Sequence, residues 1–599
     1  MNPFAIALVS AILAAPSAGA LTETSDPGPG YLSLTSDPGS TALTSISDPG
    51  PSDLRDRVER FTADRAALYR RYDVDSPTRH ARLRTFYREW EEALDRTEYD
   101  GLNLQGKIDY QLLRNRLGYE VRRLDMDGER YREALTLLPF LPSLIHLHET
   151  RRNLEPVDPR ESARILNEAT ASVNEIRRSL EGGLRGETGA SSVSPVAARR
   201  ASARAEEIRR ALSEWYGFHH GSDPLFTWWV STPYETFHRV FTGYVTFLRE
   251  QVAGVVEGTE GDIIGDPIGE AALLLDLEAE LIPYTPNELI RIAQRELAWG
   301  LGEMRRASRE LGYGDDWHAA LEHVKTLHVE PGRQTELVVE LAREAEEFLE
   351  SRELITIDPL AKEIWRMEML SAERQRFAPF FLGGETVQVA FPTLEQSHDE
   401  KSMSLRANNR HFSRAVVQHE LIPGHHLQGY MTQRYSTHRA AFATPFWGEG
   451  WALHWEFLLW DLDFPRGPED RIGMLFWRNH RAARIIFSLS FHLGTMTPEE
   501  AIDFLVEQVG HERNSAAAEV RRSFEGDYSP LYQVAYMIGG LQFRQLYRDL
   551  VESGQMTSRD FHDHILKAGR IPVEMVRASL TSQAPPRDFV SNWRFYPHD

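Results

Sequence analysis

Apolar positions along most of this chain recur at helical spacing, and strand-like alternation is rare. Segments 200–212, 287–311 and 333–352 combine that spacing with many Ala, Leu, Glu and Arg residues, which are good helix formers. The best alternating stretch is short and covers residues 385–391, ETVQVAF. The pattern therefore predicts an all-α, predominantly helical protein with at most one small β-sheet.

The first twenty residues have a different character. Residues 1–20 carry no charged side chain, contain an apolar run from Phe4 to Ala15 and end in the small residues Ala18-Gly19-Ala20. This arrangement is typical of a signal peptide, and the run is too short to span a bilayer. We expect cleavage near Ala20, export to the periplasm or the extracellular space, and no stable membrane insertion. A leader that stays attached as an anchor is the alternative.

The segment that follows is a repeat without an apolar face. Residues 21–53 contain three copies of Ser-Asp-Pro-Gly, which favour turns, so we expect a flexible linker. The helical pattern begins after it. We divide the rest into a helical N-terminal region, 54–390, and a region with the candidate site, 391–599, which we expect to form one body.

Composition and charge narrow the range of partners. The 599 residues include 67 Lys and Arg against 89 Asp and Glu, a formal net charge of −22. Such a surface repels nucleic acid and anionic lipid, so neither is an expected partner. The chain has no Cys, so an exported form would be held together by packing and not by disulfides.

The clearest chemical signal is the stretch 419–426, HELIPGHH. In H-E-x-x-H, two histidines four residues apart hold zinc and the Glu handles protons for the bound water. Here the fourth position is Pro423, and the next histidines are His425 and His426. Pro423 clashes with the carbonyl of His419, and the following Gly tolerates unusual backbone angles. We interpret Pro-Gly as a two-residue bulge that returns His425 to the metal, whereas a straighter helix would make His426 the ligand.

A second segment offers a carboxylate ligand. In residues 447–460, WGEGWALHWEFLLW, Glu449 and Glu456 are seven apart and share one face of an otherwise apolar helix. Buried carboxylates need partners because an unpaired buried charge is costly. One explanation is that Glu449 binds the metal, whereas Glu456 accepts a hydrogen bond from a histidine that binds the metal. Two salt bridges to arginines are the alternative.

Three stretches together carry a resemblance to a known family. The chain is similar to the bacterial family known as domain of unknown function 885 over most of residues 54–599. That family is regarded as gluzincin-like zinc peptidases, mainly helical and distantly similar to the thermostable carboxypeptidase Taq group. The resemblance implies a helical fold with a central cleft, one Zn²⁺ held by His419, His425 and Glu449, and Glu420 as general base. The matching stretches are 419–428 (HELIPGHHLQ), 449–456 (EGWALHWE) and 530–539 (PLYQVAYMIG).

The match is incomplete around the substrate. Residues 484–492 keep the family's Arg484 and His492, but serines replace its Asp and Gly. Hydrolysis through a tetrahedral oxyanion needs a hydrogen-bond donor besides the metal. Tyr536 and His492 are our candidates for this role, with Tyr528 and Tyr532 as nearby competitors. Substrate specificity does not carry over from the family.

These residues predict a zinc-dependent hydrolase, and specifically a peptidase that acts on a peptide or small amide substrate. A metal-dependent hydrolase of a non-peptide amide or ester would share the same site. A binding protein built on an inactive peptidase fold should have lost a ligand or the base, and His419, Glu420, His425 and Glu449 are all present.

Overall fold

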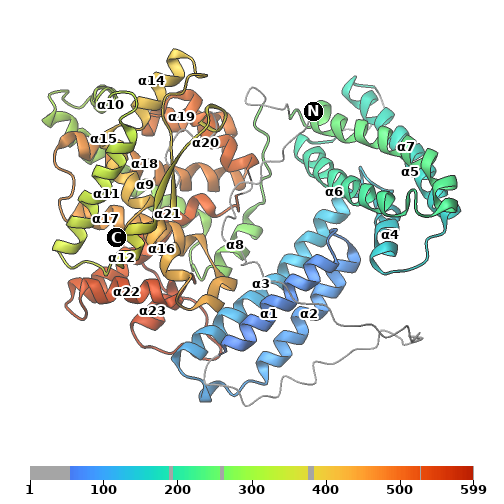
Figure 1. Cartoon of the computed structure of the whole chain (residues 1–599), viewed down its shortest axis with the longest axis horizontal. Helices are drawn as coiled ribbons and strands as arrows, with labels where there is room; N and C mark the ends of the chain where they lie inside the picture. Colours follow the sequence, from blue (N-terminus) through green and yellow to red (C-terminus); the bar gives the residue numbers. More distant parts are fainter. Residues whose placement is uncertain (1–53, 188–192, 256–261, 376–382, 527, 598–599) are drawn as a thin grey trace, which may run out of the picture. The chain divides into compact units, whose positions relative to one another are not determined.

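The computed structural model describes residues 54–597 except 188–192, 256–261, 376–382 and 527. The predicted signal peptide and the repeat linker therefore lie outside the described residues. The described chain is predominantly helical with one small sheet, as the spacing predicts (Figure 1). The described residues all belong to one compact unit.

The helices before the sheet confirm the three segments predicted from spacing. Segment 200–212 lies inside α6, 287–311 corresponds to α9, and 333–352 corresponds to α11. Helix α9 begins where Thr285 and Glu288 form a capping box around Pro286. The helices are α1 (Arg55–Arg71), α2 (Pro77–Asp95), α3 (Leu104–Ala134), α4 (Leu141–Arg152), α5 (Pro159–Leu184), α6 (Pro195–His219), α7 (Pro224–Thr246), α8 (Glu270–Ala279), α9 (Pro286–Glu310), α10 (Trp317–Lys325), α11 (Gln334–Ser351) and α12 (Pro359–Ile364), with short helical turns η1 (Tyr99–Gly101) and η2 (Phe247–Val252).

The sheet consists of two short parallel strands. Strand β1 (Arg366–Met369) pairs with β2 (Thr386–Val389), in a register that places Arg366 opposite Thr386 and Met369 opposite Val389. Strand β2 lies inside the stretch predicted from alternation, and its Val387 and Val389 are buried. The strand follows Gly383 and Gly384, which contact the end of α15, so the sheet lies beside the candidate site.

The second half of the chain supplies the elements of the candidate site. Helix α18 is buried over nearly its whole length and packs against α9, α15 and α21. The elements are α13 (Ala372–Gln375), α14 (His398–Ala407), α15 (Arg410–Glu420), α16 (His425–Thr432), η3 (Thr437–Phe442), α17 (Pro445–Asp461), α18 (Pro468–His492), α19 (Pro498–Val509), α20 (Arg513–Glu525), α21 (Tyr532–Tyr547), η4 (Arg548–Glu552), α22 (Ser558–Ala568) and α23 (Val573–Leu580).

Helices α17 and α21 pack backbone against backbone at two glycines. A Cβ atom at Gly450 would lie 2.5 Å from the backbone of Gly539, and a Cβ at Gly539 would lie 2.1 Å from the carbonyl oxygen of Phe446. Only glycine allows such an approach without displacing one helix. The crossing holds Glu449, which precedes Gly450, against the first turns of α21.

No described helix is both long enough and apolar enough to cross a membrane. Most of the apolar side chains are instead packed in the interior. The core around α17 contains the fully buried Trp447, Trp451 and Trp455 together with apolar residues from α1 to α3 and from α21 to α23.

The crossing of α17 and α21 predicts opposite effects for two neighbouring glycines. Gly450→Ala should lower stability by about 1–3 kcal/mol, because the overpacking exceeds the gain in helix propensity. Gly448→Ala is the matched control, since a Cβ there meets no atom within 4 Å. It should leave stability unchanged or raise it by up to about 1 kcal/mol. Thermal unfolding followed by circular dichroism measures both, and equal midpoints would contradict the close crossing.

Candidate metal centre

Three side chains from three helices converge on one point. One donor atom each from His419 of α15, His425 of α16 and Glu449 of α17 lies within 4.8 Å of the others. The Nε2 atoms of His419 and His425 lie 3.5 Å and 3.2 Å from Oε2 of Glu449. Donors about 2.0–2.2 Å from a tetrahedral zinc ion would be roughly 3.3–3.6 Å apart. The two separations from Glu449 lie close to this range, and the three residues could bind a metal ion.

The chain between the two histidines breaks the helix. Helix α15 ends at Glu420, α16 begins at His425, and four residues separate them. A Cβ at Gly424 would lie 1.8 Å from the carbonyl oxygen of His419, so only glycine fits this turn. The N–H of Gly424 donates to the carbonyl of Gln418 at 3.0 Å. The predicted two-residue bulge within one helix is thus corrected to a four-residue break, because the backbone after Glu420 leaves the helical path entirely.

The two adjacent histidines are the first residues of α16 and point in different directions. His425 faces His419 and Glu449, and the rings of His419 and His425 are 4.8 Å apart. His426 is buried on the other side of α16, where its Nε2–H donates to the carbonyl of Ala361 at 2.7 Å. The structure thus brings His425, and not His426, into the group.

The second nitrogen of each imidazole is held by a hydrogen bond. Nδ1 of His419 donates to Oε1 of Glu456 at 2.7 Å, as the spacing of the two glutamates suggested. Nδ1 of His425 donates to Oε1 of Gln428 at 2.9 Å, and the amide of Gln428 donates to the carbonyl of Gly448 at 2.8 Å. These bonds fix the ring orientations and leave both Nε2 atoms directed at Glu449.

The carboxylate of Glu449 is held in its charged form. Burial raises the pKa of this carboxyl group, but the two histidines outweigh it and lower the pKa well below its usual range. Burial lowers the pKa of His425, whereas Glu449 raises it, with a net value of about 9. The second oxygen, Oε1, accepts a hydrogen bond from the hydroxyl of Tyr532 at 2.5 Å. Oε2 alone therefore faces the histidines.

Glu420 is the last residue of α15 and is half-buried. Its charge helps to raise the pKa of His425, so its carboxylate lies close to the group. Gly383 packs directly on it, because a Cβ at Gly383 would lie 2.0 Å from Oε2 of Glu420. The N–H of Gly384 donates to the backbone carbonyl of Glu420 at 3.4 Å. The segment that leads into β2 thus limits where the carboxylate can lie.

Tyr536 also lies at the group. Its ring stacks against that of His419, with centroids 6.2 Å apart. The guanidinium groups of Arg481 and Arg484 lie over its ring at 4.8 Å and 4.7 Å. Burial raises the pKa of its hydroxyl, which therefore stays protonated at neutral pH.

His492 lies elsewhere, although sequence reasoning paired it with Tyr536. It is eight residues beyond Arg484 on α18, about 12 Å further along the helix. Its backbone carbonyl accepts from the N–H of Gly269, and Asp266 is the charge that acts on its ring. Burial lowers its pKa to about 4, so the ring is neutral. None of these contacts with described residues reaches the metal group.

Two contributors escaped sequence reasoning. Gln428 is three residues after His425, a spacing that brings side chains together on a helix, and this signal could have identified it. Gly383 precedes Glu420 by thirty-seven residues in an irregular segment, and no periodicity connects them.

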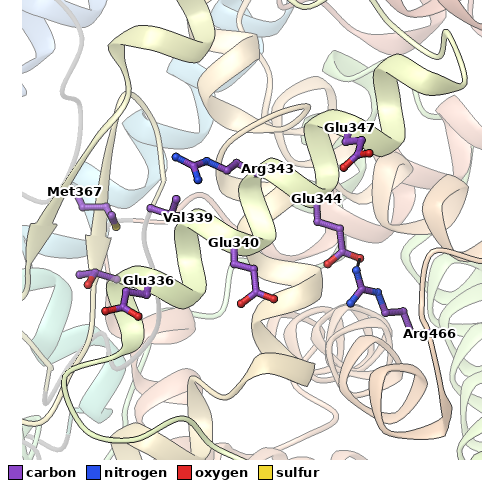
Figure 2. Close-up of a pocket in the computed structure, with 9 residues that line it drawn as sticks. Glu336, Val339, Glu340, Arg343, Glu344, Glu347, Met367 and Arg466 are labelled. Atoms are coloured by element: carbon purple, nitrogen blue, oxygen red, sulfur yellow. Dashed lines mark ion pairs between the residues drawn. The ribbon is translucent and has the colours of Figure 1, made fainter.

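A separate hollow of about 630 Å³ lies along α11 (Figure 2). Its glutamates are largely paired with arginines: Glu340 with Arg410 at 2.7 Å, and Glu344 with Arg414 at 2.7 Å and with Arg466 at 2.9 Å. None of the candidate metal ligands lines it. The hollow is therefore distinct from the metal group.

The family model described as "Bacterial protein of unknown function (DUF885)" matches residues 61–580, and the chain belongs to that family. None of the curated proteins matches the chain. Two solved structures are similar to it. One is a candidate lipoprotein of unknown function from Shewanella oneidensis, with a TM-score of 0.63, 18% identity and coverage of 88% of this chain and 98% of that one. The other is a candidate lipoprotein from Colwellia psychrerythraea, with a TM-score of 0.55, 15% identity and coverage of 89% and 98%. At these identities the likeness shows a shared fold.

The two neighbouring histidines should differ in their effect on metal content. His425→Ala removes one of three donors, so we expect it to lose most bound zinc. His426→Ala breaks only a bond to Ala361 and should cost at most the roughly 10–100-fold in affinity typical of groups outside the ligand set. Metal analysis of both variants after identical dialysis makes the comparison. Zinc retained in His425→Ala and lost in His426→Ala would overturn the ligand assignment.

Proposed function

We propose that this member of the family is a zinc-dependent hydrolase that cleaves peptide bonds. The observation that carries the proposal is the convergence of His419, His425 and Glu449 with Glu420 next to them. Each imidazole is already oriented through Nδ1, and Glu449 is already charged. Oriented imidazoles beside a charged carboxylate favour a metal site over an incidental cluster of polar residues.

The three ligands leave room for catalysis. Three protein donors with an open fourth position are typical of catalytic zinc, whereas structural zinc has four protein ligands. Among the described residues, the group that could bind a metal contains His419, His425 and Glu449 only. The chemistry that zinc supplies when bound is Lewis acidity toward water and toward a carbonyl oxygen.

Glu420 is the general base in this proposal. It is half-buried, so a substrate and a water molecule can reach it, and it directly follows the ligand His419. Its carboxylate takes the proton of the attacking water and later delivers it to the leaving amine. The close contact with Gly383 limits the positions that this carboxylate can take.

Tyr536 and Tyr532 have different roles. Tyr536 keeps its proton and lies next to His419, so its hydroxyl donates to the oxyanion that develops on the substrate. The hydroxyl of Tyr532 is bonded to Glu449 and serves to orient that ligand. His492 has no part in the proposal because it lies with residues 266–269.

We further propose that the protein acts outside the cytoplasm. The pattern of residues 1–20 is that of an export signal, and the two similar structures are described as candidate lipoproteins. Peptides or small amides are the expected substrates. The net charge of −22 disfavours nucleic acid as a partner.

Replacing the base should separate metal binding from catalysis. Glu420→Gln is nearly isosteric but cannot accept a proton, so we expect full zinc content with hydrolysis reduced about 10²–10⁴-fold. Glu353→Gln is the matched control, since Glu353 is exposed and forms a surface ion pair with Arg559. Cleavage of a random peptide library, followed by mass spectrometry, supplies the rates. Near-normal turnover of zinc-loaded Glu420→Gln would exclude Glu420 as the base, and cleavage of esters but not peptides would exclude a peptidase.

A further inference from the structure

Arg570 lies in the short connection between α22 and α23. Helix α22 packs against α16, which carries His425, and α23 packs against α21, which carries Tyr532 and Tyr536. The connection therefore links a helix that packs on the His425 side of the site to a helix that packs on the Tyr532 and Tyr536 side. No pattern in the sequence marks Arg570 as part of it.

The backbone on both sides of Arg570 is firmly braced. Arg439 donates to the carbonyl of Ala568 at 2.6 Å and is itself paired with the buried Asp109 at 2.7 Å. Gly569 has φ +94°, and a Cβ there would lie 3.1 Å from the side chain of Arg439. On the other side, Ile571 is fully buried and its N–H donates to the carbonyl of Gly569 at 3.0 Å. Arg570 is therefore presented from a rigid turn.

The guanidinium of Arg570 has no carboxylate partner among the described residues, unlike three buried arginines of the chain. Arg414 is paired with Glu344, Arg478 with Glu296 and Arg484 with Glu519. Arg570 is half-buried, yet it makes no ion pair or hydrogen bond with any residue in the described part of the chain.

The charge of Arg570 acts on the metal group. Burial lowers the pKa of its guanidinium, whereas the charges of Glu449 and Tyr532 raise it. The contacts of the Glu449 carboxylate are with other groups: Oε1 accepts from Tyr532 and Oε2 faces the two histidines. No carboxylate of the described residues therefore occupies the donors of Arg570, while its charge interacts with Glu449 of the metal group.

We propose that Arg570 binds a carboxylate of the substrate close to the scissile bond. A guanidinium presents two parallel N–H donors that match the two oxygens of a carboxylate, and partial burial strengthens the pairing. The carboxylate belongs either to the C-terminus of the peptide or to an Asp or Glu side chain next to the cleaved bond. This inference rests on the proposed peptidase function and adds the class of substrate.

Three pools of N-acetylated peptides test the inference. The first pool lacks acidic side chains and has free C-termini, the second has the same sequences as C-terminal amides, and the third has amides that each contain one Asp or Glu. The zinc-loaded protein should cleave the first or the third pool with a kcat/KM about 10–100-fold higher than the second, the range expected for a charge-assisted hydrogen bond. The preferred pool identifies the source of the carboxylate.

Substitution of Arg570 should remove that preference selectively. Arg570→Gln should abolish the preference, so that within this variant the kcat/KM for the preferred pool falls to that for the neutral amides. Arg570→Lys, which keeps the charge but loses the paired donors, should restore part of the preference. Arg559→Gln is the matched control, because Arg559 lies on α22 in a surface ion pair with Glu353. Zinc content and thermal midpoints confirm that the variants are folded.

The outcomes distinguish this inference from the proposed function. Equal cleavage of all three pools by the unmodified protein would overturn carboxylate recognition and leave the peptidase function intact. A preference that survives in Arg570→Gln, or an equal loss on all three pools, would overturn the role of Arg570. Failure to cleave any pool would contradict the peptidase function, and the inference with it.

Discussion

The close crossing of α17 and α21 at Gly450 and Gly539 is the constraint on which the site depends. Glu449 precedes the crossing glycine, so its position follows from how near the two helices come. The hydroxyl of Tyr532 reaches Glu449 at 2.5 Å because α21 begins beside it. Three fully buried tryptophans on α17 anchor the helix in the core. A wider crossing would leave Glu449 without the bond that directs Oε2 toward the histidines.

A series of buried polar side chains, linked by hydrogen bonds and close contacts, extends from α15 across α17 to α21. Glu456 holds His419, which faces Glu449, which in turn accepts from Tyr532. A divalent cation bound by His419, His425 and Glu449 would lie directly against the buried charge of Glu449. In the absence of a metal, protons on the histidines supply the compensating charge, consistent with the pKa of about 9 at His425. Metal and protons thus compete for the same nitrogen atoms.

The residue types of the site could be predicted from sequence, but their arrangement only in part. His419 and Glu449 occur in short motifs on strongly helical segments, and Glu456 follows from a spacing of seven. The break between α15 and α16 could not be derived from helical geometry, because it depends on the contact between Gly424 and the carbonyl of His419. Short motifs identify residues but not their neighbours, and this explains why His492 was placed at the site.

Contacts between segments that are distant in the sequence could not be predicted from local sequence patterns. Gly450 and Gly539 resemble ordinary glycines within helical patterns, and only their mutual approach shows why a side chain is excluded. Arg570 follows Glu449 by more than a hundred residues and lies in a turn between helices. The fold class was accessible because the apolar spacing is local, whereas these contacts arise from the packing of the complete chain.

Anomalous diffraction from crystals of the zinc-loaded protein tests the central claim most directly. The account predicts one strong zinc peak about 2.0–2.2 Å from Nε2 of His419, Nε2 of His425 and an oxygen of Glu449. Data collected on both sides of the zinc absorption edge would identify the element. A peak at His426 or among the glutamates of α11, with none between His419, His425 and Glu449, would contradict the account.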